Sequence, residues 1–257
     1  MNPFWEFFPA MNQYITRCQL VMQRGKTVCD VAIYYSIRNY PDTVLKNEEL
    51  VGGYLDENDA LKAKNQIDAY PKKKEKWDTE EKWTHSLQEL GDDLVFNGYY
   101  YFHVNEESLL NAKIENEFLK IGATTVKVLI LPNIKSISLE LAKKLEEIAD
   151  KGINLLFLET LPSRQPGFLN HEENDAKISS LMDELVKLPN VQLIKNTIKI
   201  SDYLTKQLNI IPQIVYEPSQ NSIQFIHKVT DDADYYFLRN STNKSLRLST
   251  LFTRQEK

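Results

Sequence analysis

The sequence predicts an α/β fold, a doubly wound parallel sheet followed by a partial antiparallel β-domain. The main observation lies in residues 126–158, where two short apolar runs, 126–131 and 153–158, flank a helical segment. Apolar, β-branched runs of this length are typical of strands buried on both faces of a parallel sheet. Ser138 fits the N-cap of the intervening helix and Gly152 its end. A strand, a helix and a strand in this order form a right-handed βαβ crossover, which predicts a parallel sheet.

Residues 1–27 are predicted to form an aromatic segment followed by a helix. Pro9 suits the first turn of this helix, and Gly25 follows its end. Cys18 lies at helical spacing from Met11, Ile15 and Met22, which predicts a thiol in a core. Four aromatic residues crowd the start of the chain: Phe4, Trp5, Phe7 and Phe8. Ordering these rings requires a surface, either the rest of this domain or another one, and we expect a packing partner.

Residues 28–209 are predicted to form the parallel-sheet domain. Its first strand covers residues 28–35, and the polar stretch 36–79 lacks a sustained period, which predicts an irregular insertion. A helix is predicted over residues 80–97, followed by a strand over residues 99–104. The later elements are a hairpin at 113–121, the crossover described above, a helix at 172–188, a strand at 191–194 and a helix at 201–208.

The pattern changes in residues 210–257, which are predicted to start an antiparallel β-sandwich-like domain. Short strands separated by Pro, Ser, Asn, Asp and Thr are predicted at residues 213–216, 222–229, 234–238 and 246–252. Their spacing predicts a meander that is too small to be a complete sandwich.

Composition and charge argue against several partner classes. The net charge of −5 gives no electrostatic reason to expect nucleic acid, and acidic residues interrupt or follow the basic run at 72–76. No window is long and apolar enough to span a bilayer, so we expect no membrane partner. The two cysteines, Cys18 and Cys29, cannot supply a disulfide framework or a four-ligand zinc site. The N-terminus lacks the order of a signal peptide, and the compartment stays undecided.

Binding and catalytic residues of parallel sheets lie at the carboxyl ends of the strands. In this sequence those ends carry few reactive groups. Residues 36–41 follow the first strand without a glycine that would let the backbone approach a phosphate, which argues against a flavin mononucleotide site. Asn133 ends the third strand, where a phosphoacceptor receiver needs an aspartate. Neither cysteine follows a strand suited to the nucleophile of an amidotransferase.

Three residues at these strand ends are candidates for a site: Glu106, Asn133 and Glu159. A pair of carboxylates can act as acid and base on a glycosidic bond if their separation is right, but a helix-cap or loop role is the preferred interpretation. The histidines show no metal-ligand spacing to one another or to a cysteine: His85, His103, His171 and His227. The domain is therefore interpreted as a scaffold.

Several stretches of the chain carry a family resemblance. They read YITRCQ, QRGK and VCDVAIYY within residues 14–35, GYYYFHVNE at 98–106 and VLILPN at 128–133. Together they resemble the segment that follows the catalytic barrel in glycoside hydrolase family 106, the α-L-rhamnosidase family. ADYYFLRN at 233–240 is more weakly similar to the opening of that family's downstream β-domain. The resemblance covers most of the chain except residues 36–79, and it rests on packing motifs.

The resemblance implies a flavodoxin-like domain and a parent enzyme that hydrolyses L-rhamnosides in plant-type polysaccharides by an inverting, calcium-assisted mechanism. The family's catalytic carboxylates lie on a barrel, and this chain shows no eightfold strand–helix repeat, so no catalytic residue is carried over. We expect no cofactor in this chain, because calcium is implied for the parent only. Asn2 and Trp5 lie near the expected barrel rim and are candidates for sugar contact, with interdomain packing as the default. The resemblance also suggests a secreted or periplasmic parent.

The leading hypothesis is a non-catalytic accessory segment of an α-L-rhamnosidase-like glycoside hydrolase. That enzyme would bind carbohydrate through a barrel domain that we expect this chain to lack. One alternative is a stand-alone module that binds carbohydrate or another small molecule through aromatics of the β-meander: Tyr216, Phe225, Tyr235 and Tyr236. A third hypothesis is a small-molecule enzyme that uses the carboxyl edge of the sheet, with Glu106, Asn133 and Glu159 nearby.

Overall fold

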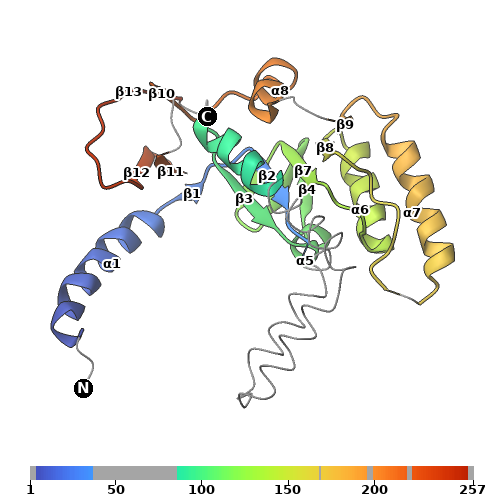
Figure 1. Cartoon of the computed structure of the whole chain (residues 1–257), viewed down its shortest axis with the longest axis horizontal. Coiled ribbons are helices and arrows are strands. Elements are labelled where there is room, and N and C mark those ends of the chain that lie inside the picture. The colour runs from blue at the N-terminus through green and yellow to red at the C-terminus, as the bar shows by residue number, and fades with distance from the viewer. Residues whose placement is uncertain (1–3, 37–85, 168, 196–198, 219–221, 254–257) are drawn as a thin grey trace, which may run out of the picture.

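A computed structural model describes residues 4–36, 86–167, 169–195, 199–218 and 222–253 (Figure 1). Its centre is a five-stranded parallel sheet in the order β3-β2-β7-β8-β9. The strands are β2 (Val31–Tyr34), β3 (Tyr101–Val104), β7 (Val128–Pro132), β8 (Asn154–Leu158) and β9 (Val191–Ile194). This is the strand order of a flavodoxin-like, doubly wound sheet, and it confirms the predicted fold class.

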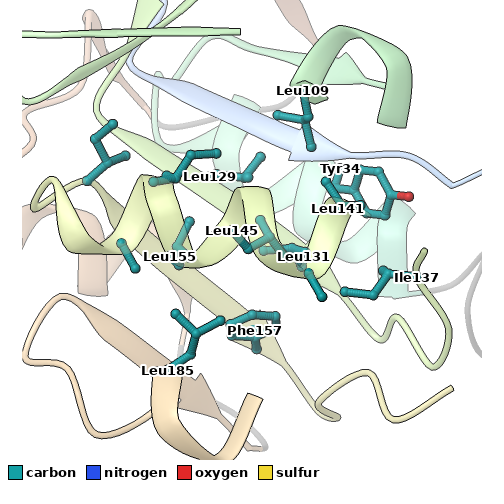
Figure 2. Close-up of a cluster of buried hydrophobic side chains, with 14 of the residues drawn as sticks. Tyr34, Leu109, Leu129, Leu131, Ile137, Leu141, Leu145, Leu155, Phe157 and Leu185 are labelled. Atoms are coloured by element: carbon teal, nitrogen blue, oxygen red, sulfur yellow. The ribbon is translucent and has the colours of Figure 1, made fainter. Parts of the chain in front are cut away.

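Two helices, α6 (Leu139–Asp150) and α7 (His171–Leu185), cover one face of the sheet and pack against each other. Because side chains alternate along a strand, Ala32 and Tyr34 of β2 face these helices. Figure 2 shows the resulting core, in which Leu141 and Leu145 of α6 lie against side chains of the sheet.

The opposite face of the sheet receives a helix at residues 86–96 and α8 (Ile200–Lys206). Val31 and Ile33 of β2 point to this side and pack with Leu90 and Leu94 of the first helix. Both faces of the sheet are therefore covered, which explains why its strands are apolar runs without alternation.

A small three-stranded antiparallel sheet precedes β7, beyond the short helix α5 (Glu106–Leu110). It consists of β4 (Lys113–Glu115), β5 (Phe118–Ile121) and β6 (Thr124–Val126). The predicted hairpin at residues 113–121 is confirmed, but Val126 ends the third strand of this sheet and does not open β7. The backbone N–H groups of Lys127 and Val128 both donate to the carbonyl of Asp30. These two hydrogen bonds lie at the break between β6 and β7.

The C-terminal strands form two sheets, where the sequence suggested one meander. β11 (Ile223–Val229) and β12 (Asp234–Asn240) form a hairpin, and β1 (Lys26–Thr27) adds to it from the N-terminal part of the chain. β10 (Ile214–Glu217) pairs with β13 (Ser249–Phe252). Residues from predicted segments 1–27 and 210–257 thus share a sheet, and the boundaries between these segments remain predictions.

The N-terminal helix α1 (Phe8–Met22) follows a 3-10 turn, η1 (Trp5–Phe7), and extends away from the sheet (Figure 1). None of its residues is buried. The prediction that Cys18 is a core thiol was wrong, because this side chain is only half-buried. Cys29, in contrast, is buried.

Some predictions fall on residues outside the described ranges: the insertion at 36–79 apart from Ser36, the start of the helix at residue 80, the basic run at 72–76, His85 and Asn2. Within the described part of the chain, no helix is both long enough and apolar enough to cross a bilayer.

Candidate functional site

The strand order reverses at β2, which has β3 on one side and β7 on the other. In doubly wound sheets, ligands bind at the carboxyl ends of the strands where this reversal occurs. Tyr35 and Ser36 follow β2 at this point, and Asn133 follows β7. The ring of Tyr35 lies edge-on to His103 of β3, with ring centroids 5.5 Å apart. Burial lowers the pKa of His103, so its imidazole is neutral at neutral pH.

Two of the predicted candidates, Asn133 and Glu159, follow the neighbouring strands β7 and β8. Both have a left-handed backbone, with φ of +46° and +67°. The hydroxyl of Thr160 donates to the Asn133 amide oxygen over 3.3 Å, and the Asn133 N–H donates to the Leu158 carbonyl over 2.9 Å. The side chain of Asn133 therefore holds the β7 and β8 loops together, whereas that of Glu159 is exposed.

The third candidate, Glu106, lies apart from these two, because β2 separates its strand β3 from β7. It opens α5, whose N-cap is Asn105, and the Asn105 side chain accepts a 2.9 Å hydrogen bond from the Ser108 N–H. A carboxylate in the first turn is favoured by the helix dipole. The structure thus brings Asn133 and Glu159 to adjacent strand ends and places Glu106 elsewhere on the edge.

Trp5, predicted as a sugar-contacting or packing residue, is 73% exposed and packs edge-on against Phe8 at 5.5 Å between ring centroids. Phe4 and Phe7 are also exposed. Within the described residues these rings enter no hydrophobic core, and the expected packing partner stays a prediction.

A cavity of about 420 Å³ lies between the parallel sheet and the β11–β12 hairpin. Tyr100, which precedes β3, and Tyr101, which opens it, line one side, and side chains of the hairpin line the other. The hydroxyl of neighbouring Tyr99 lies 2.6 Å from the Thr205 hydroxyl and donates to the Ile210 carbonyl over 2.8 Å. These bonds fix the backbone of this segment and so the positions of the two tyrosines that follow.

The hairpin side of the cavity combines Phe237 with Gln224 and Arg239. Sequence reasoning missed this arrangement, although the consecutive tyrosines before and at the start of β3 belong to the stretch GYYYFHVNE that it quoted for the family resemblance. Two of the meander aromatics proposed for a binding module, Tyr216 and Phe225, are buried, with exposed fractions of 2% and 6%. They pack in a core with Ile214 and Ile223 and cannot offer an exposed platform.

A histidine–aspartate pair, in which the histidine is buried and the aspartate half-buried, lies in the same hairpin. Nε2 of His227 lies 2.8 Å from the Asp234 carboxylate, and the imidazole stacks on the Tyr236 ring at 4.0 Å. Burial lowers the pKa of His227 although the bond to Asp234 acts in the opposite direction. Among the described residues, no three His, Cys, Asp or Glu side chains gather closely enough to hold a metal ion.

Comparison with known proteins gives one family and one relative. Residues 76–257 match glycoside hydrolase family 106, whose description is alpha-L-rhamnosidase. A Formosa agariphila protein named "Putative beta-glucuronidase" is 25% identical over 98% of the chain. The chain spans 17% of the length of that relative. No solved structure matches the chain.

Proposed function

The chain belongs to the α-L-rhamnosidase family, glycoside hydrolase family 106, and from this premise we propose that it is a non-catalytic accessory segment of such an enzyme. In this proposal the carboxylates that break the glycosidic bond belong to a barrel domain outside the chain. The segment supplies a rigid scaffold and a helix that packs against the rest of the enzyme, whose substrates are plant-type polysaccharides.

The exposed apolar surface of α1 is the observation that carries this proposal. Its exposed large hydrophobic residues are Met11, Tyr14, Ile15, Leu20 and Met22, each at least 40% exposed. Burying a side chain of this kind contributes roughly 1.5–3 kcal/mol. A helix of 15 residues is marginal on its own in water. A projecting helix with several such residues therefore gains stability by packing against another surface.

The contacts at the carboxyl edge of the sheet favour a structural role for that edge. The amide of Asn133 binds Thr160, and the side chain of Asn105 caps α5. These polar groups hold loops together, as expected for a scaffold. The relative's greater length, of which the chain spans 17%, supports a role within a larger protein.

The proposal predicts that the purified chain lacks glycosidase activity. We would assay 4-nitrophenyl α-L-rhamnoside and 4-nitrophenyl β-D-glucuronide, with added calcium and with a chelator. The expected result is no hydrolysis above the rate without protein. Turnover of about 1 s⁻¹ or more, which is typical of enzymes, would overturn the accessory role.

Variants distinguish the source of any activity that is found. Loss of that activity in Glu106→Gln or Glu159→Gln would assign it to the edge of the sheet. The exposed carboxylate of Glu140, in the first turn of α6, provides a matched control, Glu140→Gln.

A further inference from the structure

The register of the β11–β12 hairpin places its cavity-lining side chains in two cross-strand pairs. Gln224 lies opposite Arg239, and Ile226 lies opposite Phe237. Directly paired residues of antiparallel strands project from the same face, and residues two apart along a strand share it. The open face of the hairpin therefore carries an apolar pair, Ile226 and Phe237, beside a polar pair, Gln224 and Arg239.

The facing wall of the cavity is aromatic. Tyr100 and Tyr101 line it, and the imidazole of His103 lies edge-on to the Tyr101 ring at 5.6 Å. Burial raises the pKa of both tyrosines, so their hydroxyls remain protonated and can donate hydrogen bonds. The cavity thus has aromatic and aliphatic walls with a few polar groups, which is the composition of small-molecule sites.

Arg239 gives the cavity a positive charge at its polar end. Among the described residues, no carboxylate forms an ion pair with its guanidinium. Its charge acts on the Tyr14 hydroxyl of α1, where it opposes the rise in pKa that the bond to Cys18 causes. A guanidinium in this setting can bind a carboxylate through two parallel hydrogen bonds.

We propose that this cavity binds one uronic acid residue of a saccharide. The carboxylate lies on Arg239, the C–H face of the sugar ring packs against Phe237 and the tyrosines, and Gln224 bonds a ring hydroxyl. The volume of about 420 Å³ lies within the range of small-molecule pockets, roughly 300–1,000 Å³. This site rests on the proposed function, because an accessory segment of a polysaccharide-degrading enzyme gains from holding the polymer near the catalytic barrel.

The test compares two sugars that differ at one position. Methyl β-D-glucuronide carries a carboxylate at C6 where methyl β-D-glucoside carries a hydroxymethyl group. Titration of the ¹⁵N-labelled chain by NMR would give the dissociation constant of each. We expect about tenfold tighter binding of the glucuronide, with shifts at Tyr100, Tyr101 and Arg239, since hydrogen bonds to charged groups contribute on this scale.

Substitutions at Arg239 test the role of its charge. Arg239→Met should weaken glucuronide binding about tenfold and remove the preference over the glucoside, and Arg239→Lys should retain part of it. Arg164→Met is the matched control, because Arg164 is an exposed arginine whose backbone pairs with Ser136, in the loop between β7 and α6. Circular dichroism checks that each variant is folded, which is expected because Arg239 is exposed.

Three results would overturn the site: no glucuronide binding up to the solubility limit, equal affinity for both sugars, or unchanged affinity in Arg239→Met. These failures would leave the accessory role standing. Turnover in the aryl glycoside assay, in contrast, would remove the accessory role and leave glucuronide binding at Arg239 unaffected.

Discussion

The α-carbon of Gly98 lies directly against the carbonyl oxygen of Ile214, so that a Cβ at this position would overlap that oxygen. Gly98 has φ of +76°, a conformation that L side chains rarely adopt. Its own carbonyl accepts hydrogen bonds from the N–H groups of Gln213, at 2.9 Å, and Ile214, at 3.3 Å. This close approach joins the end of helix 86–96 to β10 and thereby connects the parallel-sheet domain to the C-terminal strands.

Gly98→Ala should therefore lower the free energy of unfolding by about 3 kcal/mol or more, through left-handed strain and steric overlap together. Gly152 is the matched control, because it has φ of +81° but no neighbouring atom within 4 Å of an added Cβ. Gly152→Ala should cost only about 1 kcal/mol. Urea denaturation measures both, and equal losses would contradict the importance of the Ile214 contact.

The two cysteines should differ strongly in reactivity. Burial raises the pKa of the Cys29 thiol to about 12, and its Sγ lies 3.1 Å from the Val31 carbonyl. The thiolate is the reactive form, so Cys29 should not react with a thiol reagent at pH 8 until the protein unfolds. Cys18 on α1 is half-buried and should react in the native state. A native Cys18→Ser variant that still reacts rapidly would contradict this expectation.

The buried His227 should make stability fall in mild acid. Burial lowers its pKa in the folded state, so the unfolded chain, in which histidine titrates near about 6.5, binds a proton more readily. The contribution of the neutral His227 imidazole to the free energy of unfolding is present above that pH and is lost as the pH falls below it. His227→Gln should reduce the loss of unfolding free energy between about pH 7 and 5.5. If the free energy of unfolding of His227→Gln fell with pH as steeply as that of the wild type, this imidazole would not titrate as argued.

The exposed apolar side chains of η1 and α1 should promote association without supporting the fold. Replacing Trp5 and Phe7 with Ser and Met11 with Gln should reduce concentration-dependent self-association, because exposed apolar patches drive it. The melting temperature should stay the same, since these side chains enter no described core. Sedimentation velocity and thermal unfolding measure the two effects.

Leu169→Ser is the matched control for this triple variant, because Leu169 is a single apolar side chain that is 81% exposed near the start of α7. Leu169→Ser should change neither the self-association nor the melting temperature. A clear loss of thermal stability in the triple variant would show that α1 packs against this domain.

The central crossover was predictable because local residues define each of its elements. The hydroxyl of Ser138 accepts a 3.0 Å hydrogen bond from the Leu141 N–H, as the predicted N-cap requires. Two apolar runs then gave the neighbouring strands β7 and β8. The break between β6 and β7 was not predictable, because it depends on Asp30, which is distant in sequence and also forms a 3.0 Å ion pair with Lys127.

Other features depend on pairings that leave no periodic signal. Cys18 lies on an apolar helix face, but periodicity identifies a face and not the surface that covers it. Of the predicted site residues, Asn133 and Glu159 do lie at adjacent strand ends, since the sheet order follows from the crossovers. Gln224 and Arg239 lie opposite each other only in the register of the β11–β12 hairpin, which sequence spacing alone does not fix.

The pairing of β1 with β11 has a consequence for the order of folding during synthesis. Lys26 pairs with Val229, and Lys228 Nζ donates to the carbonyl of Met22 at the end of α1. On the ribosome, α1 emerges long before β11 is made, so nothing in that hairpin can yet anchor it. The direction in which the helix points is settled only when translation of these residues is nearly complete. Until then the exposed aromatic side chains of η1 and α1, which include Trp5, Phe7 and Tyr14, are open to chaperones.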